Sequence, residues 1–325
     1  MDVKPAALST GSVGSLGELL VEFVCTERDG RNRRAATYMG PFPSGAPAIF
    51  IDQAARIGAR AIFAGAVGDD AFGQVLCERL ASAGVSRDLV RTVAGVPTGT
   101  AFVSYNSDGS RDFVFNIARS AAARFPAGAE AVEAVCGFGA DVFHISGSTL
   151  GDPSMAKAAL EICRGLHAAG VEISFDPNIR KELLADPAYM ETVTALLGLA
   201  AYVLPSSEDA EVLFPGESFA DFAPRLHAGG ARCVVLKRGA QGCIGSDPSG
   251  AVEALAGHAV EVVDPTGAGD CFCATFVALT VSGRFGFRDA LARANAAGAL
   301  AVGRIGPMEG NSTLAEIEAF LESRR

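Results

Sequence analysis

The chain has 325 residues, of which 49% are hydrophobic and 20% are charged, and its formal net charge is −10. A chain with this length and balance can bury a large core without disulfides or metals, which excludes a disordered protein. The negative charge argues against general nucleic-acid binding, which needs a basic face. Its apolar runs fall short of the ~20 residues of a membrane-spanning helix, so neither a nucleic acid nor a membrane is an expected partner.

The cysteines and the N-terminal residues point to a protein of the cytoplasm. The eight cysteines include no CxxC pair and stand mostly among apolar residues, a pattern typical of buried thiols in a reducing compartment. The first residues contain no apolar core of signal-peptide length, so we expect a cytoplasmic protein. The one basic cluster is predicted to be a solvated turn and consists of Arg28, Arg31, Arg33 and Arg34.

Short apolar runs alternate with longer alanine-rich segments along most of the chain. This rhythm predicts an α/β protein with a mainly parallel sheet covered by helices. The predicted strands are 16–24, 61–66, 142–146, 172–176, 201–204 and 233–237. The predicted helices are 46–57, 73–83, 155–168, a segment around Leu226, 267–282, 287–302 and 314–323. No repeat or long linker divides the chain, so residues 1–325 are expected to form one domain.

The N-terminal glycines Gly11, Gly14 and Gly17 form a near match to the dinucleotide-binding fingerprint. That fingerprint needs a strand before the glycines and a helix after them. Here a strand pattern follows instead, so we interpret GSVGSLG as a flexible N-terminal turn. There is no Walker-type phosphate loop, and the four histidines lie too far apart in sequence to suggest a catalytic zinc.

Residues 98–117 break the α/β rhythm, because two alternating runs are separated by NSDGS. The Asp-Gly pair is a strong hairpin signal. Together with segment 35–43, this hairpin is predicted to form a small sheet that projects from the core and acts as a lid.

The strongest candidate for a binding or catalytic segment runs from 259 to 283 and contains DPTGAGD. We expect a strand ending at Val263, a compact loop and a long apolar helix starting at about Gly267. Gly267, Ala268 and Gly269 have almost no side chain, so their backbone N–H groups and the helix dipole could receive an anion. Asp270 then lies in the first helical turn. Taken alone, this segment fits a capped helix start with an acidic first turn equally well.

The wider context favours the functional interpretation, because DPTGAGD followed by an apolar helix resembles the second signature of the PfkB/ribokinase family of carbohydrate kinases. Four more segments resemble that family in its usual order: 44–73 (the first signature), FDPNIR at 175–180, LPSSEDAEVLF at 204–214 and LKRGAQG at 236–242. The resemblance implies a three-layer ribokinase-like α/β fold with a small β-sheet lid. It also implies that ATP, Mg²⁺ and a sugar bind at the carboxyl ends of the strands.

The resemblance implies roles for individual residues. Asp270 matches the base that accepts the proton of the attacking sugar hydroxyl, and Gly267, Ala268 and Gly269 match the anion hole. The sugar-side positions are Glu22, Gly45, Asn178 and Arg180, with Arg119 from the lid. The nucleotide-side positions are Ser206, Lys237, Gly239, Gly242 and Asn295.

Two metal sites are also implied. Asp209 occupies the place of a carboxylate that holds Mg²⁺ through water. Asp264 and Thr266, with the 305–307 turn, match a monovalent-cation (K⁺) site of many members; a loop-capping role for Asp264 is an equal alternative.

The pattern departs from the family where the sugar and the metal bind. Ser206 and Asp209 replace the asparagine and glutamate of the NxxE segment, Glu22 replaces an aspartate, and Ile49 replaces an asparagine. GELLVEF and FDPNIRKELL look most like 2-keto-3-deoxygluconate kinases and related kinases of tagatose or fructose. The arginine that sugar-acid kinases place before the lid's SA pair is Ile117 here, and Arg119 comes two residues later. Both a sugar acid and a neutral ketohexose therefore stay open as acceptors.

Three further expectations follow. The substitutions at Ile49, Ser206 and Asp209 keep open a non-catalytic sugar- or nucleotide-binding protein on the same fold. A nucleoside kinase would share the same chemistry and differ only in its acceptor. Lids in this family often pair between subunits, so a homodimer through the lid is a further prediction.

Overall fold

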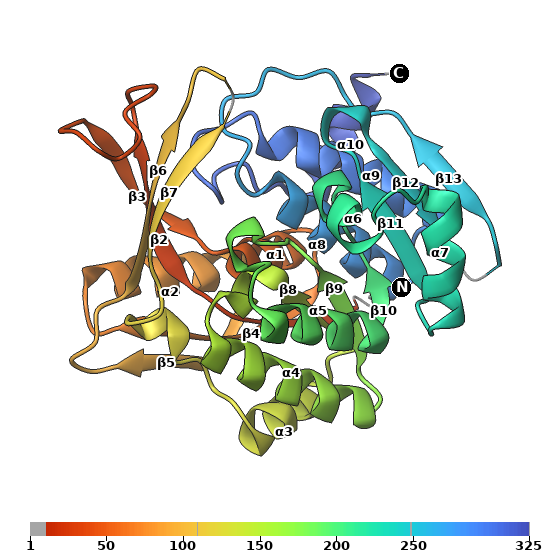
Figure 1. Cartoon of the computed structure of the whole chain (residues 1–325), viewed down its shortest axis with the longest axis horizontal. Coiled ribbons are helices and arrows are strands. Elements are labelled where there is room, and N and C mark those ends of the chain that lie inside the picture. The colour runs from red at the N-terminus through yellow and green to blue at the C-terminus, as the bar shows by residue number, and fades with distance from the viewer. Residues whose placement is uncertain (1–10, 109, 248, 325) are drawn as a thin grey trace, which may run out of the picture.

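The computed structural model of the chain describes residues 11–108, 110–247 and 249–324. It contains a nine-stranded sheet with the order β13-β12-β11-β10-β9-β8-β1-β4-β5 and a four-stranded sheet with the order β3-β2-β6-β7. Figure 1 shows the small sheet, in red to yellow, standing at one side of a layered body of helices and central strands. The predicted fold class, a mainly parallel α/β sheet with a separate small sheet, is confirmed.

The central sheet is parallel from β5 through β11, and its last two pairings, β11 with β12 and β12 with β13, are antiparallel. Its strands are β1 (Ser12–Leu16), β4 (Arg60–Gly68), β5 (Ser86–Val93), β8 (Val142–Ser146), β9 (Glu172–Asp176), β10 (Ala200–Val203), β11 (Cys233–Lys237), β12 (Cys243–Ser246) and β13 (Val252–Leu255). The inner strands are buried on both faces, as continuous apolar runs in a parallel sheet require.

Helices cover both faces of this sheet, and each face has its own apolar cluster. One face carries α1 (Ala46–Arg56), α2 (Ala71–Ala83), α8 (Ala268–Val281), α9 (Phe287–Ala301) and α10 (Leu314–Glu322). The other carries α3 (Ala129–Phe138), α4 (Pro153–Ala168), α5 (Pro187–Leu199), α6 (Ser207–Leu213) and α7 (Phe219–Ala228). Short 3-10 turns occupy Ala121–Ala123, Gly147–Gly151, Lys181–Leu183 and Gly239–Gln241. Helix α8 is apolar all round because α1 and α9 pack against it.

The predicted flexible turn at 11–17 is wrong, and the predicted strand at 16–24 is correct only from Leu20 onwards. The segment forms two strands that belong to different sheets: β1 lies in the middle of the central sheet, and β2 (Leu20–Cys25) lies in the small one. Gly14 is buried in β1, where an added Cβ would lie 2.5 Å from Cδ2 of Phe143. Strand β1 (SVGSL) consists mostly of small residues and lies between β8 and β4. Its sequence has no hydrophobic pattern that would distinguish it from a loop.

The predicted strand ending at Val263 is also wrong. Strand β13 ends at Leu255, and residues 256–265 adopt no regular structure before α8 begins. The sequence interpretation missed β5, β12, β13, α3, α5 and α6 as well. The start of α8, with Gly267 as its N-cap residue, is as predicted.

The small sheet confirms the predicted hairpin and its partner segment. Strands β6 (Gly99–Tyr105) and β7 (Arg111–Asn116) pair antiparallel, and β3 (Tyr38–Ser44) contributes the predicted arm. Gly109, the glycine of the predicted turn, lies outside the described residues. Strand β2 joins β3 to β6, with Glu22 beside Ala101. Because β2 follows β1 closely, the small sheet is tied directly to the centre of the large one.

The remaining sequence expectations concern surfaces and thiols. The four arginines at positions 28, 31, 33 and 34 are exposed in a loop, as predicted. All eight cysteines are free, and six of them are buried. Within the described ranges, no helix is long and apolar enough to cross a membrane.

Candidate active site

Polar residues gather at the carboxyl ends of the parallel strands, which meet at one edge of the sheet. Strand β1 leads into Glu18, β9 ends at Asp176 and leads into Asn178 and Arg180, and β11 ends at Lys237. Helix α8 begins with its N-terminus in the same place, since a Cβ added to Gly269 would lie 3.6 Å from Nζ of Lys237. This edge brings together most of the residues that the sequence singled out.

Asp270 lies in the first turn of α8 and is 9% exposed. Burial raises its pKa to about 8; the Asp176 and Glu18 carboxylates also raise it, and Lys237 and Arg180 lower it. A carboxyl group with this pKa can take up and release a proton near neutral pH, which is what a general base requires.

Gly267 and Gly269 have different structural roles in the loop before Asp270. Gly267 has a φ of +85°, and an added Cβ would lie 2.5 Å from the carbonyl oxygen of Pro307. Gly269 is open, with only Nζ of Lys237 within 4 Å of an added Cβ, at 3.6 Å. The N–H groups of Ala268, Gly269 and Asp270 belong to the first turn of α8, so they have no acceptor within the helix. They can bind an anion beside Asp270.

Lys237 forms a buried ion pair with Asp176, and its Nζ also lies 3.3 Å from Sγ of Cys273. The side chain of Lys237 is 12% exposed and that of Asp176 is 4% exposed. Burial by itself lowers the pKa of Lys237, but Asp176, Cys273 and Asp209 together raise it above its ordinary value. Lys237 is therefore engaged by the protein's own carboxylate. The sequence interpretation quoted Asp176 within FDPNIR but gave it no role.

Two buried carboxylates lie near this edge on the sugar side. Glu22, on β2, accepts a hydrogen bond from the Ser44 hydroxyl at 3.0 Å, and burial raises its pKa to about 7. Its other oxygen, Oε1, is buried without a partner in the described part of the chain. Glu18 accepts hydrogen bonds from Ser148 at 2.6 Å and Thr149 at 2.9 Å, and burial raises its pKa. Glu18 was missed, although it is the second residue of the quoted GELLVEF motif.

The loop after β9 orients Asn178 and Arg180. Asn178 has a φ of +36° and donates to Oγ of Ser146 at 3.2 Å. Arg180 lowers the pKa values of both Glu18 and Asp270, so its guanidinium acts on the cluster. Within the residues described, Arg180 forms no salt bridge, which leaves its donors available for a ligand.

Several nucleotide-side and metal-side positions have structural partners of their own. Ser206 and Asp209 form a capping box at α6, and Asp209 also accepts from the N–H of Ile179 at 2.7 Å. Asn295 donates to the carbonyl oxygen of Ala256 at 2.9 Å. Among the described residues, no group of three or more His, Cys, Asp or Glu side chains could hold a metal ion.

The other predicted glycines differ in what surrounds them. A Cβ added to Gly45 would lie 2.2 Å from the carbonyl oxygen of Glu18, and a Cβ added to Gly242 would lie 2.1 Å from the carbonyl oxygen of Leu255. These two glycines make room for the chain's own backbone. Gly239 has a φ of +53° and nothing within 4 Å of an added Cβ, so it is open to a ligand.

The small sheet contacts the loop before α8 at Asp264, a residue of that loop that is fully buried. Its carboxylate accepts from the N–H of Thr266 at 2.9 Å, the N–H of Gly306 at 3.0 Å and the Tyr105 hydroxyl. The Tyr105 hydroxyl also lies 3.1 Å from Oγ1 of Thr266, and Arg111 donates to that oxygen at 3.5 Å. Tyr105 and Arg111 were missed, because nothing in the sequence indicates which side of a hairpin faces a distant loop.

Arg119, the sugar-side position predicted from the lid, lies outside the strands of the small sheet. Strand β7 ends at Asn116, and Arg119 is exposed in the turn that follows. It lines a pocket of about 750 Å³ beside the small sheet, together with Asp70, Phe72 and Thr98.

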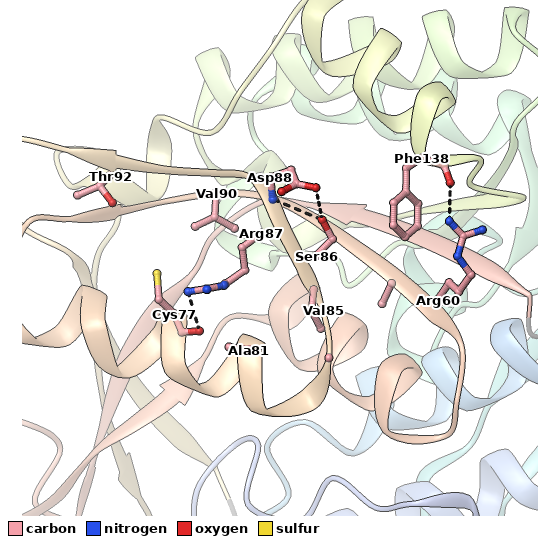
Figure 2. A pocket seen from close by; sticks show the side chains of 12 residues that line it. Arg60, Cys77, Ala81, Val85, Ser86, Arg87, Asp88, Val90, Thr92 and Phe138 are labelled. Carbon is pink, nitrogen blue, oxygen red and sulfur yellow. Dashed lines mark hydrogen bonds between the residues drawn. The ribbon is translucent and has the colours of Figure 1, made fainter.

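A second pocket of about 750 Å³ lies along the edge strand β5 and contains none of the predicted site residues. Figure 2 shows the two arginines that line it already bonded to backbone oxygens. Arg60 donates to Phe138 at 3.0 Å and Arg87 to Cys77 at 3.4 Å. The chemistry of the molecule is therefore concentrated at the carboxyl edge of the sheet.

Comparison with known proteins agrees with this geometry. The model of the pfkB family of carbohydrate kinases matches residues 11–314. Fructokinase-1 of Oryza sativa subsp. japonica is 32% identical over 323 residues, which cover 96% of this chain and 98% of that protein. A ribokinase-like protein of E. coli, solved with ATP and Mg²⁺, superposes with a TM-score of 0.89 at 37% identity, covering 96% of this chain and 99% of that one.

A double mutant of fructokinase from Vibrio cholerae O395 was solved with fructose, ADP and a potassium ion. It superposes with a TM-score of 0.80 at 26% identity and covers 97% of this chain and 99% of that one. The resemblance inferred from the sequence motifs is confirmed. The chain belongs to the pfkB family and is a carbohydrate kinase that transfers phosphate to a sugar hydroxyl.

Proposed function

We propose that this protein is an ATP-dependent kinase of a neutral ketohexose such as fructose, with Asp270 as the base. The observation that carries the proposal is the position of Asp270, which is buried in the first turn of α8 beside backbone N–H groups that can bind an anion. The similarity to plant fructokinases and to a fructose-bound neighbour supports the same acceptor class.

The buried carboxylates favour a neutral sugar over a sugar acid. Glu18, Glu22 and Asp270 can accept hydrogen bonds from hydroxyls, and the free Oε1 of Glu22 is a ready acceptor. A substrate carboxylate beside these acidic groups would lose its hydration and would raise their pKa values further, which is costly. The lid position at which sugar-acid kinases have an arginine is Ile117.

In the proposed reaction, the sugar hydroxyl attacks the γ-phosphorus of ATP while Asp270 takes the hydroxyl proton. The bond between the γ-phosphorus and the β–γ bridging oxygen breaks, and ADP leaves. The N–H groups at Gly267 to Gly269 stabilise charge on the transferred phosphoryl group. Mg²⁺, when bound, neutralises phosphate charge, held through water at Asp209 and by the phosphates themselves. Asp264 and Thr266 would hold a monovalent cation, since the Asp264 carboxylate is buried and has only neutral donors within the described chain.

A substrate panel tests this function directly. The protein with Mg·ATP is incubated with fructose, tagatose, ribose, 2-keto-3-deoxygluconate and adenosine in turn, and ADP release is followed. We expect the highest kcat/KM for a ketohexose. A preference for the keto-deoxy acid would overturn the acceptor class, and a preference for adenosine would favour a nucleoside kinase. Ligand-induced stabilisation without any ADP would favour the binding-protein alternative.

The small sheet is proposed to close over the sugar and exclude water, so that ATP is not hydrolysed. Tyr105→Phe removes the hydroxyl that joins this sheet to Asp264 and Thr266. A hydrogen bond to a charged group is worth about 1.5–3 kcal/mol, so we expect the acceptor KM to rise about tenfold or more. The ratio of ATP hydrolysis to sugar phosphorylation should rise with it.

Tyr38→Phe is the matched control, because the Tyr38 hydroxyl donates only within the small sheet and its loop, to Asn32 at 2.9 Å. It should leave both quantities near their original values. Equal effects of the two substitutions would contradict the lid role of Tyr105.

A homodimer through this sheet and a cytoplasmic location stay predictions. The exposed side chains of Met39, Val114 and Phe115 on the sheet are consistent with pairing between subunits.

A further inference from the structure

Three residues from three elements meet beside Asp270. Asp176 ends β9, Lys237 ends β11, and Cys273 lies one turn after Asp270 on α8. Lys237 pairs with Asp176, Nζ of Lys237 lies 3.3 Å from Sγ of Cys273, and that thiol donates to Asp176 at 3.5 Å. The second oxygen of Asp176, Oδ1, is buried and has no partner in the described part of the chain.

The ammonium group of Lys237 lies against the backbone that would bind the transferred phosphoryl group. A Cβ on Gly269 would be 3.6 Å from Nζ of Lys237, and nothing else outside its own helix and chain neighbours comes within 4 Å. The pair is thus placed where its two opposite charges act on both the anion hole and Asp270. Charges so little exposed are weakly screened by solvent.

We propose that the Asp176–Lys237 ion pair is a positioning pair that sets the proton affinity of Asp270 and holds a positive charge beneath the anion hole. This goes beyond the nucleotide-side role that the family resemblance implies for Lys237, and it rests on the proposed role of Asp270 as the base. Without Asp176, no carboxylate would offset the positive charge of Lys237, and that charge would favour the ionised form of Asp270. Without Lys237, the two carboxyl groups would compete for one proton.

The groups around Asp270 define the expected signs. Glu18 faces it from the loop after β1, Asp176 and Arg180 from β9 and its loop, and Lys237 from β11. The thiols of Cys271 and Cys273 on α8 stay neutral, because burial raises their pKa values well above the ordinary range. Asp176 raises the pKa of Asp270 and Lys237 lowers it. Removing Asp176 alone should therefore lower that pKa, and removing Lys237 in addition should raise it again.

The test compares pH profiles of kcat/KM for the ketohexose in the wild type, Asp176→Asn and the double variant Asp176→Asn/Lys237→Met. The acid limb of Asp176→Asn should move down by roughly 1–2 pH units, the usual effect of an unopposed neighbouring charge. In the double variant the limb should return towards the wild-type position, while kcat falls about tenfold because the positive charge beneath the anion hole is gone. The step from single to double variant isolates the charge of Lys237.

A matched control lies on the same two strands at their other ends. Glu172 begins β9, Arg232 precedes β11, and the two form a salt bridge. The side chain of Glu172 is 29% exposed and that of Arg232 is 61% exposed. Glu172→Gln and Glu172→Gln/Arg232→Met should leave the acid limb in place. Thermal melting of every variant shows whether it folds. Neutral replacement of a buried pair is usually tolerated, so the double variant provides a test even if Asp176→Asn does not fold.

Identical acid limbs in the single and the double variant would overturn the inference, as would an unchanged kcat in the double variant. Asp270→Asn separates this failure from failure of the proposed function. If Asp270→Asn keeps its rate, the base assignment fails. If Asp270→Asn is inactive but the limbs coincide, only the role of the ion pair fails.

Discussion

Asp270→Asn is expected to lower kcat by about 10²–10⁴-fold, the usual contribution of a general base. Asparagine has almost the same shape but cannot accept the proton of the sugar hydroxyl. The Kd of Mg·ATP should change little, because the backbone N–H groups of Gly267 to Gly269 stay in place. Single-turnover kinetics and calorimetric titration with a non-hydrolysable ATP analogue measure the two quantities. A kcat within tenfold of the wild type would show that another group takes the proton.

The pH dependence of the wild type follows from the same residue. With a pKa of about 8 in the free enzyme, Asp270 is protonated at acid pH, so kcat/KM should rise with pH and level off above about 8. Binding of Mg²⁺ beside the site would move this limb down. The acid limb should be missing from whatever activity remains in Asp270→Asn.

Asp270→Asn should also stabilise the protein at alkaline pH. The folded-state pKa is raised from 3.8 to about 8, so the charged form destabilises the fold, increasingly as pH rises from about 4 to about 8. The gain in unfolding free energy should be larger at pH 8.5 than at pH 5.5, by about 3 kcal/mol. Thermal melting at the two pH values measures it. Stabilisation together with lost turnover would exclude misfolding as the cause of inactivity.

Gly267→Ala is expected to lower kcat/KM by about 10²–10³-fold, the effect of losing one anion-hole donor. The added methyl group would lie 2.5 Å from the carbonyl oxygen of Pro307 and 3.3 Å from Cγ2 of Ile49, at a φ of +85°. The loop must move, which turns its N–H groups away from the phosphoryl group. We also expect a loss of about 1–3 kcal/mol in unfolding free energy.

Gly283→Ala is the control for this substitution, because Gly283 follows the other end of α8. It also has a positive φ, +64°, but an added Cβ would meet nothing within 4 Å. Gly283→Ala should destabilise the protein modestly and leave kcat/KM near the wild-type value. Comparable activity losses in both variants would mean that backbone strain in α8, rather than displacement of the anion hole, is responsible.

Local motifs identified most of the predicted site, because each is short and follows a strand or opens a helix. DPTGAGD, FDPNIR and LKRGAQG each bring their residues to the carboxyl edge of the sheet, so a resemblance in sequence order located them in space. The same motifs did not reveal what their residues contact. Lys237 belongs to a quoted motif, but its pairing with Asp176 joins strands that are 61 residues apart in sequence.

The amino-acid sequence by itself determined the α/β class, the hairpin at β6 and β7, the start of α8 and the family, because these depend on periodicity and on contiguous motifs. Only the tertiary structure decided that residues 12–25 divide between two sheets, that Tyr105 contacts Asp264, and that Glu18 and Asp176 raise the pKa of Asp270. Those facts depend on contacts between distant segments and on burial. Length, composition and a net charge of −10 carry no information about which carboxylates will be forced together away from water.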